Sequence, residues 1–231
     1  MAKYSRLKVI TTMIETGMVP VFYHPDVKIT ASVIEACAAG GVHCFEFTNR
    51  GDMAHEVFKE ISMRFKTDDR VILGAGSVLD AGTAALYIQL GANFIVGPVL
   101  NPEVARLCNR RKIAYFPGCG TASEISNAEE LGVEICKIFP GGAVGGPAFV
   151  KDILGPMPWS RLMPTGGVDA TEESVNGWFK AGVACVGMGS KLFKKDLIDS
   201  GNFAELTETV KQVLSWIKKA RLGTPLDFMK E

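Results

Sequence analysis

The sequence LGVEICKIFP, residues 131–140, combines a glycine stop with a short apolar run that contains one lysine. Gly132 is suited to end a helix, because glycine adopts the left-handed conformation that closes a helical turn. The run EICKIFP (134–140) has the length and apolar character of a buried strand. Lys137 lies in the middle of this run, so the fold has to place an amine within an otherwise apolar strand.

The same combination of a glycine stop and an apolar run recurs along the chain. Four runs are introduced by similar motifs, AGGV (39–42), LGAN (90–93), LGVE (131–134) and AGVA (181–184). Strand-like runs alternate with helical segments at a spacing that fits a strand followed by a crossover helix. The eight predicted strands are residues 18–24, 43–49, 71–77, 93–99, 113–119, 134–140, 161–167 and 184–190.

The predicted strands are apolar at their beginnings instead of alternating between polar and apolar residues. Such runs are typical of parallel strands, whose two faces are both covered. Eight strand–helix units favour a closed (β/α)8 barrel, the TIM barrel, and an open doubly wound sheet is the alternative. We therefore predict an α/β fold of this class in a single domain, residues 1–231, with the barrel strands within residues 18–195.

The two ends of the chain are predicted to add helices to the barrel. Residues 1–17 form an extra N-terminal helix that covers the N-terminal end of the barrel, with Leu7, Ile10 and Ile14 on one face. Residues 196–231 provide the final helix, at 203–221, and a tail. Between the strands, helix start and stop signals are clearest in residues 101–112, 121–132 and 171–182.

Composition and charge exclude several classes of partner. Lys+Arg and Asp+Glu both number 25, so nothing suggests attraction to nucleic acid or to an acidic membrane. No apolar run is long enough to span a membrane, and the N-terminus lacks the features of a signal peptide. Neither the six cysteines nor the three histidines have metal-ligand spacing. We expect a cytoplasmic protein with reduced thiols, no metal and no cofactor.

Polar side chains are concentrated near the C-terminal ends of the predicted strands, where barrels place their chemistry. Glu46, Thr48 and Arg50 share one face of their strand, and Lys137 shares its face with Ile135 and Phe139. Burial disfavours the ammonium form of a lysine, and a neutral amine can attack a ketone to form a Schiff base. The alternative is a structural ion pair between Lys137 and Glu46.

Two further features of the strand ends suggest an anionic ligand. Arg50 is suited to grip a carboxylate, although a surface pair with Asp52 is the alternative. The turns PTGG (164–167) and GMGS (187–190) end neighbouring strands, where backbone N–H groups can approach a phosphate. Glycine pairs also serve ordinary tight turns. Lys191, directly after the second turn, is a rival to Lys137 as the reactive lysine.

Taken together, these motifs resemble those of the 2-keto-3-deoxy-6-phosphogluconate (KDPG) and 4-hydroxy-2-oxoglutarate (KHG) aldolases. The likeness runs in order from about residue 5 to 195. The resemblance implies a class I aldolase on a (β/α)8 barrel, without a metal and commonly a homotrimer. The motifs are FEFTNR (45–50), LGAGSVLD (73–80), FIVGPVLNPE (94–103), YFPGCGTASE (115–124), CKIFPGGAVGGPAFVK (136–151), PTGGV (164–168) and GMGSKLF (187–193).

The resemblance also implies roles at the reacting end of the substrate. Lys137 would be the Schiff-base lysine and Glu46 the general acid and base. Arg50, together with Ser77, would hold the substrate carboxylate, and Phe139 would pack against the pyruvyl unit. Ser77 stands where many members have threonine, so the hydroxyl group is kept.

At the other end of the substrate, the resemblance implies that Thr165 contacts the sugar acid. Gly166, Gly167, Gly189 and Ser190 would receive its phosphate. The expected substrate is a phosphorylated keto acid, KDPG, cleaved to pyruvate and glyceraldehyde 3-phosphate, with KHG as a further candidate. Three alternatives stay open: a galactonate-derived phosphate, a phosphosugar isomerase or epimerase without covalent chemistry, and a non-catalytic sensor of keto-acid phosphates.

Overall fold

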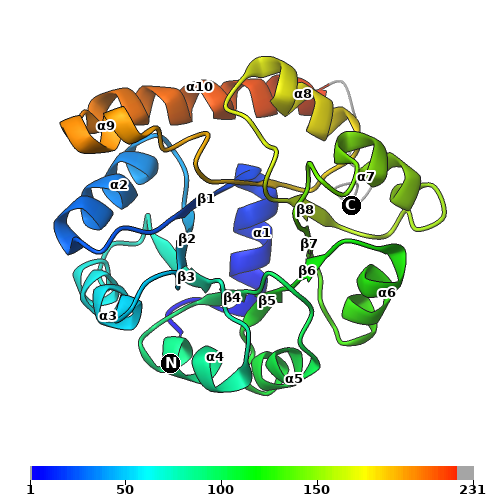
Figure 1. Ribbon diagram of the computed structural model, residues 1–231, viewed down its shortest axis with the longest axis horizontal. Coiled ribbons are helices and arrows are strands. Elements are labelled where there is room, and N and C mark those ends of the chain that lie inside the picture. The colour runs from blue at the N-terminus through cyan, green and yellow to red at the C-terminus, as the bar shows by residue number, and fades with distance from the viewer. Residues whose placement is uncertain (1, 223–231) are drawn as a thin grey trace.

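The strands curl around a common centre, an arrangement called the ring below, with helices outside it in the computed structural model, which describes residues 2–222 (Figure 1). Every strand pairing within these residues is parallel. A six-stranded sheet has the order β5-β4-β3-β2-β1-β9, and a three-stranded sheet has the order β6-β7-β8. The bounds are β1 Met18–Phe22, β2 Cys44–Thr48, β3 Ile72–Gly76, β4 Phe94–Val96, β5 Ala114–Phe116, β6 Gly118–Cys119, β7 Cys136–Ile138, β8 Leu162–Pro164 and β9 Val186–Met188.

All eight predicted strands are present, and the fifth is divided into β5 and β6 by Pro117. Proline has no N–H group, so it cannot donate to the ladder at that point. Its carbonyl still accepts a hydrogen bond from the N–H of Lys137, at 3.0 Å. On the other side, an isolated bridge between Thr165 and Gly187 joins the end of β8 to β9. The fold is therefore α/β with a curled, parallel sheet.

Helices pack around the outside of the strands (Figure 1). The helices predicted at 101–112, 121–132, 171–182 and 203–221 are confirmed, while the short helix α9 was not predicted. The tail expected at 224–231 lies outside the described residues. No helix among residues 2–222 is long and apolar enough to cross a membrane. The bounds are α2 Val27–Ala39, α3 Ala54–Arg64, α4 Ala81–Gln89, α5 Pro102–Arg111, α6 Ala122–Glu130, α7 Gly146–Leu154, α8 Glu172–Lys180, α9 Lys195–Ser200 and α10 Phe203–Leu222.

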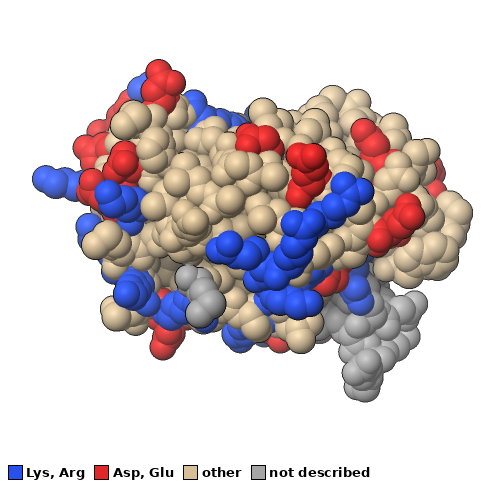
Figure 2. All heavy atoms as spheres, turned by 90° about the horizontal axis from the view of Figure 1, so that it is seen from below, with Lys and Arg blue, Asp and Glu red and all other residues tan. Residues whose placement is uncertain are grey.

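Basic side chains gather over α5 on the face that Figure 2 shows. Arg110 and Arg111 lie in the last turn of this helix. Positive charge is favourable there, because the C-terminal end of a helix carries partial negative charge. The local structure of the helix thus accounts for these two arginines.

The N-terminal helix α1, Arg6–Thr16, crosses the middle of the ring (Figure 1). Val9, Ile10 and Met13 are buried against the inward faces of the strands. The prediction that Leu7 shares the buried face is wrong, since Leu7 is 73% exposed. At about 100° per residue, Leu7 lies roughly a third of a turn from the centre of the buried stripe.

Side-chain alternation along the strands creates two core layers. Outward side chains pack under the helices, and inward ones form a second apolar cluster with α1. Because alternate strand residues share a face, Glu46 follows Cys44 on the inward side and Lys137 follows Ile135. The inner cluster consists of Val9, Ile10, Met13, Val19, Cys44, Ile72, Phe94, Val96, Ala114, Phe116, Ile135, Met163 and Cys185.

Candidate active site

Lys137 and Glu46 meet inside the ring, although they come from strands that are not neighbours. Lys137 Nζ lies 3.6 Å from Glu46 Oε1, and the two side chains are 5% and 1% exposed. The ring of Phe139 lies 5.1 Å from the same nitrogen, measured to the ring centre. The amine is therefore enclosed by apolar groups and faces one carboxyl group. The amine and the carboxyl group thus lie within ion-pair distance of each other, away from bulk water.

Gly76 makes the position of Glu46 possible. A Cβ atom at residue 76 would lie 1.9 Å from Glu46 Oε1, so the carboxyl group occupies the space that any other residue would fill. The second oxygen, Oε2, is buried and has no hydrogen-bond partner within the described residues. A buried oxygen in this state is costly unless a ligand donates to it. The carboxyl group thus has one oxygen toward the amine and one available to a substrate.

Arg50 and Ser77 come together just beyond the ends of β2 and β3. Arg50 Nε donates to Ser77 Oγ at 3.3 Å. Strand β2 ends at Thr48, so the predicted alternation does not extend to Arg50, which is exposed whereas Thr48 is buried. The alternative pairing of Arg50 with Asp52 is not among the ion pairs of the described chain.

The backbone at Ser77 is in the left-handed region, with φ 58°. This conformation is uncommon for a residue other than glycine, and such residues are concentrated at functional sites. The turn that follows β3 therefore presents a hydroxyl group to Arg50 from a strained position. A guanidinium and a hydroxyl side by side are suited to bind a carboxylate.

The two glycine turns lie beside each other, as their neighbouring strands require. Gly166 and Gly167 have φ of +83° and +81°, so both adopt a conformation that favours glycine. Thr165 Oγ1 is buried without a hydrogen-bond partner in the described part of the chain. A Cβ atom at residue 187 would lie 2.2 Å from this oxygen, so the absence of a side chain at Gly187 makes room for Thr165. Gly189 and Ser190 follow directly after β9.

Lys191, the rival lysine, lies outside this interior. Its side chain is 66% exposed, and its Nζ is 3.7 Å from Asp169 Oδ1. A lysine that is exposed and ion-paired at the surface lacks the enclosed surroundings that activate an amine as a nucleophile. Of these two lysines, only Lys137 combines burial with a carboxyl partner and an aromatic neighbour.

Two buried residues that the sequence analysis missed hold the site from the outside. Tyr87 of α4 donates its hydroxyl to Asn49 Oδ1 at 2.9 Å, directly before Arg50. Trp178 of α8 donates its indole N–H to the carbonyl of Gly167 at 3.2 Å. Both residues occupy apolar positions of helices, where no sequence signal separates such a contact from ordinary core packing.

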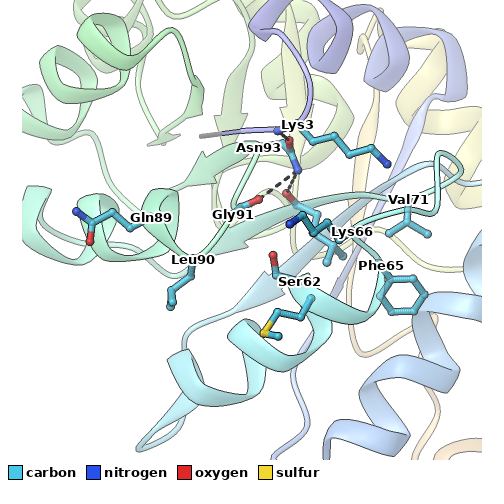
Figure 3. Close-up of a pocket in the computed structure, with 11 residues that line it drawn as sticks. Lys3, Ser62, Phe65, Lys66, Val71, Gln89, Leu90, Gly91 and Asn93 are labelled. Carbon is cyan, nitrogen blue, oxygen red and sulfur yellow. Dashed lines mark hydrogen bonds between the residues drawn. The ribbon is translucent and has the colours of Figure 1, made fainter.

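Figure 3 shows a pocket of about 500 Å³ at the other end of the strands. Asn93 at its inner wall is fully engaged: its Oδ1 accepts from the backbone N–H groups of Lys3 and Tyr4, and its Nδ2 donates to the carbonyls of Leu73 and Gly91. Asn93 therefore attaches the N-terminal segment to the sheet. None of the predicted site residues lines it. Nor do residues 2–222 contain three or more His, Cys, Asp or Glu side chains grouped to hold a metal ion.

The fold and this geometry define a class of protein: an α/β enzyme with a buried lysine and glutamate inside a curled parallel sheet. Residues 9–209 match the family described as KDPG and KHG aldolase. The 2-dehydro-3-deoxy-phosphogluconate aldolase of Haemophilus influenzae is 30% identical over 217 residues, which cover 93% of this chain and 99% of the relative. The chain belongs to the KDPG and KHG aldolase family, and the predicted resemblance is confirmed.

Further relatives and a solved structure agree with this assignment. The KHG/KDPG aldolase of Escherichia coli is 29% identical, over 90% of this chain and 95% of the relative. The KDPG aldolase of Legionella pneumophila, solved with pyruvate captured as a covalent carbinolamine, superposes with a TM-score of 0.80. That structure is 27% identical and covers 88% of this chain, with 97% of its own chain matched. The protein is an aldolase of the lyase class and uses class I chemistry.

Proposed function

We propose that this aldolase cleaves KDPG to pyruvate and glyceraldehyde 3-phosphate, and that it accepts KHG as a second substrate, which would give pyruvate and glyoxylate. One observation carries the proposal: Lys137 Nζ lies 3.6 Å from Glu46 Oε1 inside a buried interior. The names of the relatives support the substrate class, since they include both KDPG aldolases and KHG/KDPG aldolases.

In the proposed mechanism, the neutral amine of Lys137 attacks the C2 ketone of the substrate. Loss of water from the carbinolamine gives a cationic imine, which can accept the electron pair of the C3–C4 bond. Glu46 removes the proton of the C4 hydroxyl group as this bond breaks, and the aldehyde product leaves. The enamine that remains is protonated at C3, and water then hydrolyses the imine to release pyruvate and the free amine.

The other residues would position the substrate for these steps. Arg50 and Ser77 would bind the C1 carboxylate, and Phe139 would pack against the pyruvyl unit. Their support is the Arg50–Ser77 hydrogen bond of 3.3 Å and the position of the Phe139 ring beside Lys137. A carboxylate held at this end would anchor the substrate with C2 beside the amine, and this contact would change little as the bonds at C2, C3 and C4 rearrange.

At the far end, Thr165 would contact the hydroxyl groups of the sugar acid. Gly166, Gly167, Gly189 and Ser190 would bind its phosphate through N–H and hydroxyl groups. The support is the adjacency of the two turns and the unpartnered Thr165 Oγ1 within the described residues. A substrate that spans both ends would lie across the mouth of the ring.

We further infer that the ring closes as a (β/α)8 barrel within one domain of residues 1–231. Two contacts support closure: β5 and β6 continue each other across Pro117, and the N–H of Ala184 donates to the carbonyl of Leu162 at 3.0 Å. A homotrimer is proposed from the family resemblance, and sedimentation equilibrium tests it against the 24.9 kDa of one chain. The cytoplasmic location stays a prediction.

Borohydride trapping tests the proposed roles of Lys137 and Glu46. Reduction in the presence of pyruvate should attach a pyruvyl group to Lys137, located by peptide mass mapping. Lys191→Met is the matched control and should trap normally, whereas Lys137→Met should not trap. Glu46→Gln should still trap pyruvate while its turnover of KDPG falls by about 10²–10⁴-fold, because only proton transfer is lost.

Other outcomes of this experiment would reject the assignment. An adduct on another lysine, or none, removes Lys137 from the mechanism, and normal turnover in Glu46→Gln removes Glu46. A lactate dehydrogenase-coupled assay with KDPG, its galactonate-derived C4 epimer and KHG decides the substrate. The isomerase or epimerase and the sensor, which the sequence left open, require no buried nucleophile, and the family membership favours neither.

A further inference from the structure

The turn of residues 165–167 is fixed from two sides by its backbone carbonyls. The carbonyl of Gly166 accepts from the N–H of Gly142 at 2.9 Å, within the loop that follows β7. The carbonyl of Gly167 accepts from the indole N–H of Trp178 at 3.2 Å. Trp178 belongs to α8 and is 2% exposed. One side of the turn is thus attached to the loop after Lys137, and the other side to an outer helix.

The contact with the loop leaves the turn no room to shift in that direction. A Cβ at Gly167 would lie 2.7 Å from the Cα of Gly142, so the two backbones touch directly. On the opposite side, the indole of Trp178 provides the directional contact. Tryptophan has a single hydrogen-bond donor and no acceptor. Its N–H therefore specifies where the Gly167 carbonyl points.

A fixed carbonyl also fixes the N–H group of the next residue. The carbonyl of Gly167 and the N–H of Val168 belong to one planar trans peptide, in which they point in opposite directions. Because the carbonyl points to α8, the N–H of Val168 points away from α8. This N–H group has no hydrogen-bond partner within residues 2–222. The same geometry applies to the preceding peptide. The carbonyl of Gly166 is bound to the N–H of Gly142, so the N–H of Gly167 points in the opposite direction.

We propose that Trp178 is a positioning residue for phosphate recognition, which holds the peptide between Gly167 and Val168 so that its N–H group faces the phosphate. This inference rests on the proposed function, and it adds Val168 to the groups that bind the phosphate. The effect of Trp178 is confined to the phosphate end of the substrate, because its contact is with the turn and not with Lys137, Glu46 or Arg50.

Trp178→Phe tests the proposal, since phenylalanine keeps an aromatic ring but has no donor. kcat/KM for KDPG should fall about tenfold through KM, the factor that one hydrogen bond is worth. kcat/KM for KHG, which carries no phosphate, and trapping of pyruvate on Lys137 should stay unchanged. Trp159→Phe is the matched control, because Trp159 is 66% exposed and bonds to Glu129 instead.

The outcomes separate this inference from the proposed function. Suppose that the wild type cleaves both substrates. If Trp178→Phe then lowers kcat/KM equally for KDPG and KHG, or changes neither value, the positioning role is wrong and the proposed function stands. If the wild type cleaves neither substrate, the proposed function itself fails. A selective loss with KDPG alone supports the inference.

A second measurement does not depend on how well Trp178→Phe folds. The chain has three tryptophans, so Trp159→Phe combined with Trp216→Phe leaves Trp178 as the sole tryptophan, whose emission can be excited selectively. Its fluorescence should change saturably with inorganic phosphate and with glyceraldehyde 3-phosphate, and not with pyruvate. The proposal would be overturned if the emission did not change with inorganic phosphate or with glyceraldehyde 3-phosphate, or if it changed equally with pyruvate.

Discussion

Gly76 decides where the carboxyl group of Glu46 can lie, because any side chain at residue 76 would occupy the same space. We predict that Gly76→Ala lowers turnover of KDPG by on the order of 10²-fold, since the new Cβ would lie 1.9 Å from Glu46 Oε1 and displace it. The backbone at residue 76 is not in the left-handed region, so alanine itself is tolerated there. Steady-state kinetics and borohydride trapping measure the effect.

Gly155→Ala provides the control for this substitution. A Cβ at residue 155 would meet only carbonyl oxygens at 3.6 and 3.8 Å, which is ordinary contact. This variant should keep full turnover. Trapping of pyruvate should survive in Gly76→Ala, because Lys137 is untouched, and undiminished turnover there would show that the position of Glu46 does not limit the reaction.

At the residue scale, the inward position of Lys137 and Glu46 could be predicted from the sequence, because a charged residue in an otherwise apolar parallel strand has few places to point. Lys137 and Glu46 both meet this condition, and alternation places both inward. Trp178 and Tyr87 do not: each lies at a buried helix position that apolar packing alone would explain. Their hydrogen bonds depend on how helices are placed against strand ends, and no local pattern encodes that placement.

At the scale of elements, α4 holds the loop that carries Arg50. Tyr87 is fully buried, its ring centre lies 5.1 Å from that of Phe58, and its hydroxyl donates to Asn49 Oδ1. Burial raises the pKa of Tyr87 to about 12, so the hydroxyl keeps its proton throughout the physiological range. The hydrogen bond between α4 and the loop after β2 is therefore independent of pH there.

We predict that Tyr87→Phe raises KM for both KDPG and KHG about three- to tenfold and leaves kcat nearly unchanged. In the proposed complex, Arg50 binds the carboxylate to the same extent in the ground state and the transition state, so loosening Arg50 should weaken binding without slowing the chemistry. Tyr4→Phe is the control, because the Tyr4 hydroxyl bonds to Asp69 in an exposed position, away from Arg50. A fall in kcat at constant KM would contradict this role.

Sequence patterns predicted strands more reliably than helix faces, and the reasons are physical. A strand buried on both faces needs a continuous apolar run, so all eight runs could be found. Pro117 divides the fifth predicted strand because it lacks an N–H group. This interrupts the hydrogen bonds of the sheet but does not change the path of the chain. Leu7 was misplaced because α1 packs against the first residues of the strands, such as Cys44 and Ile72, with Val9 and Met13 and not Leu7 facing them.

At the scale of the whole molecule, the two core layers bury thiols and phenols that ionise in an unfolded chain. Burial raises the pKa of Cys108 and of Cys185 from 9.0 to about 12, and it also raises the pKa of Cys37 and Cys44. Cys44 and Cys185 belong to the inner layer, and Cys37 and Cys108 to the outer one. Both layers therefore resist deprotonation.

Stability should consequently decrease at alkaline pH. Between pH 9 and the raised pKa, each of these thiols keeps its proton in the folded state and loses it in the unfolded state, so the unfolded state binds fewer protons. Each buried thiol then lowers the free energy of unfolding by about 1.4 kcal/mol per pH unit. This loss of stability is absent below about pH 8 and is complete once the pH passes the pKa of the thiol in the folded state. Urea midpoints, measured by circular dichroism under reducing conditions at pH 7, 8, 9 and 10, should be level at first and then fall.

Cys185→Ala separates this titration from packing. The cavity that this substitution leaves lowers stability by the same amount at every pH. The loss of the thiol removes about one proton from the difference between the folded and unfolded states, so stability falls less steeply with alkaline pH. A midpoint that stays level up to pH 10 would contradict the prediction, and so would a slope that Cys185→Ala leaves unchanged.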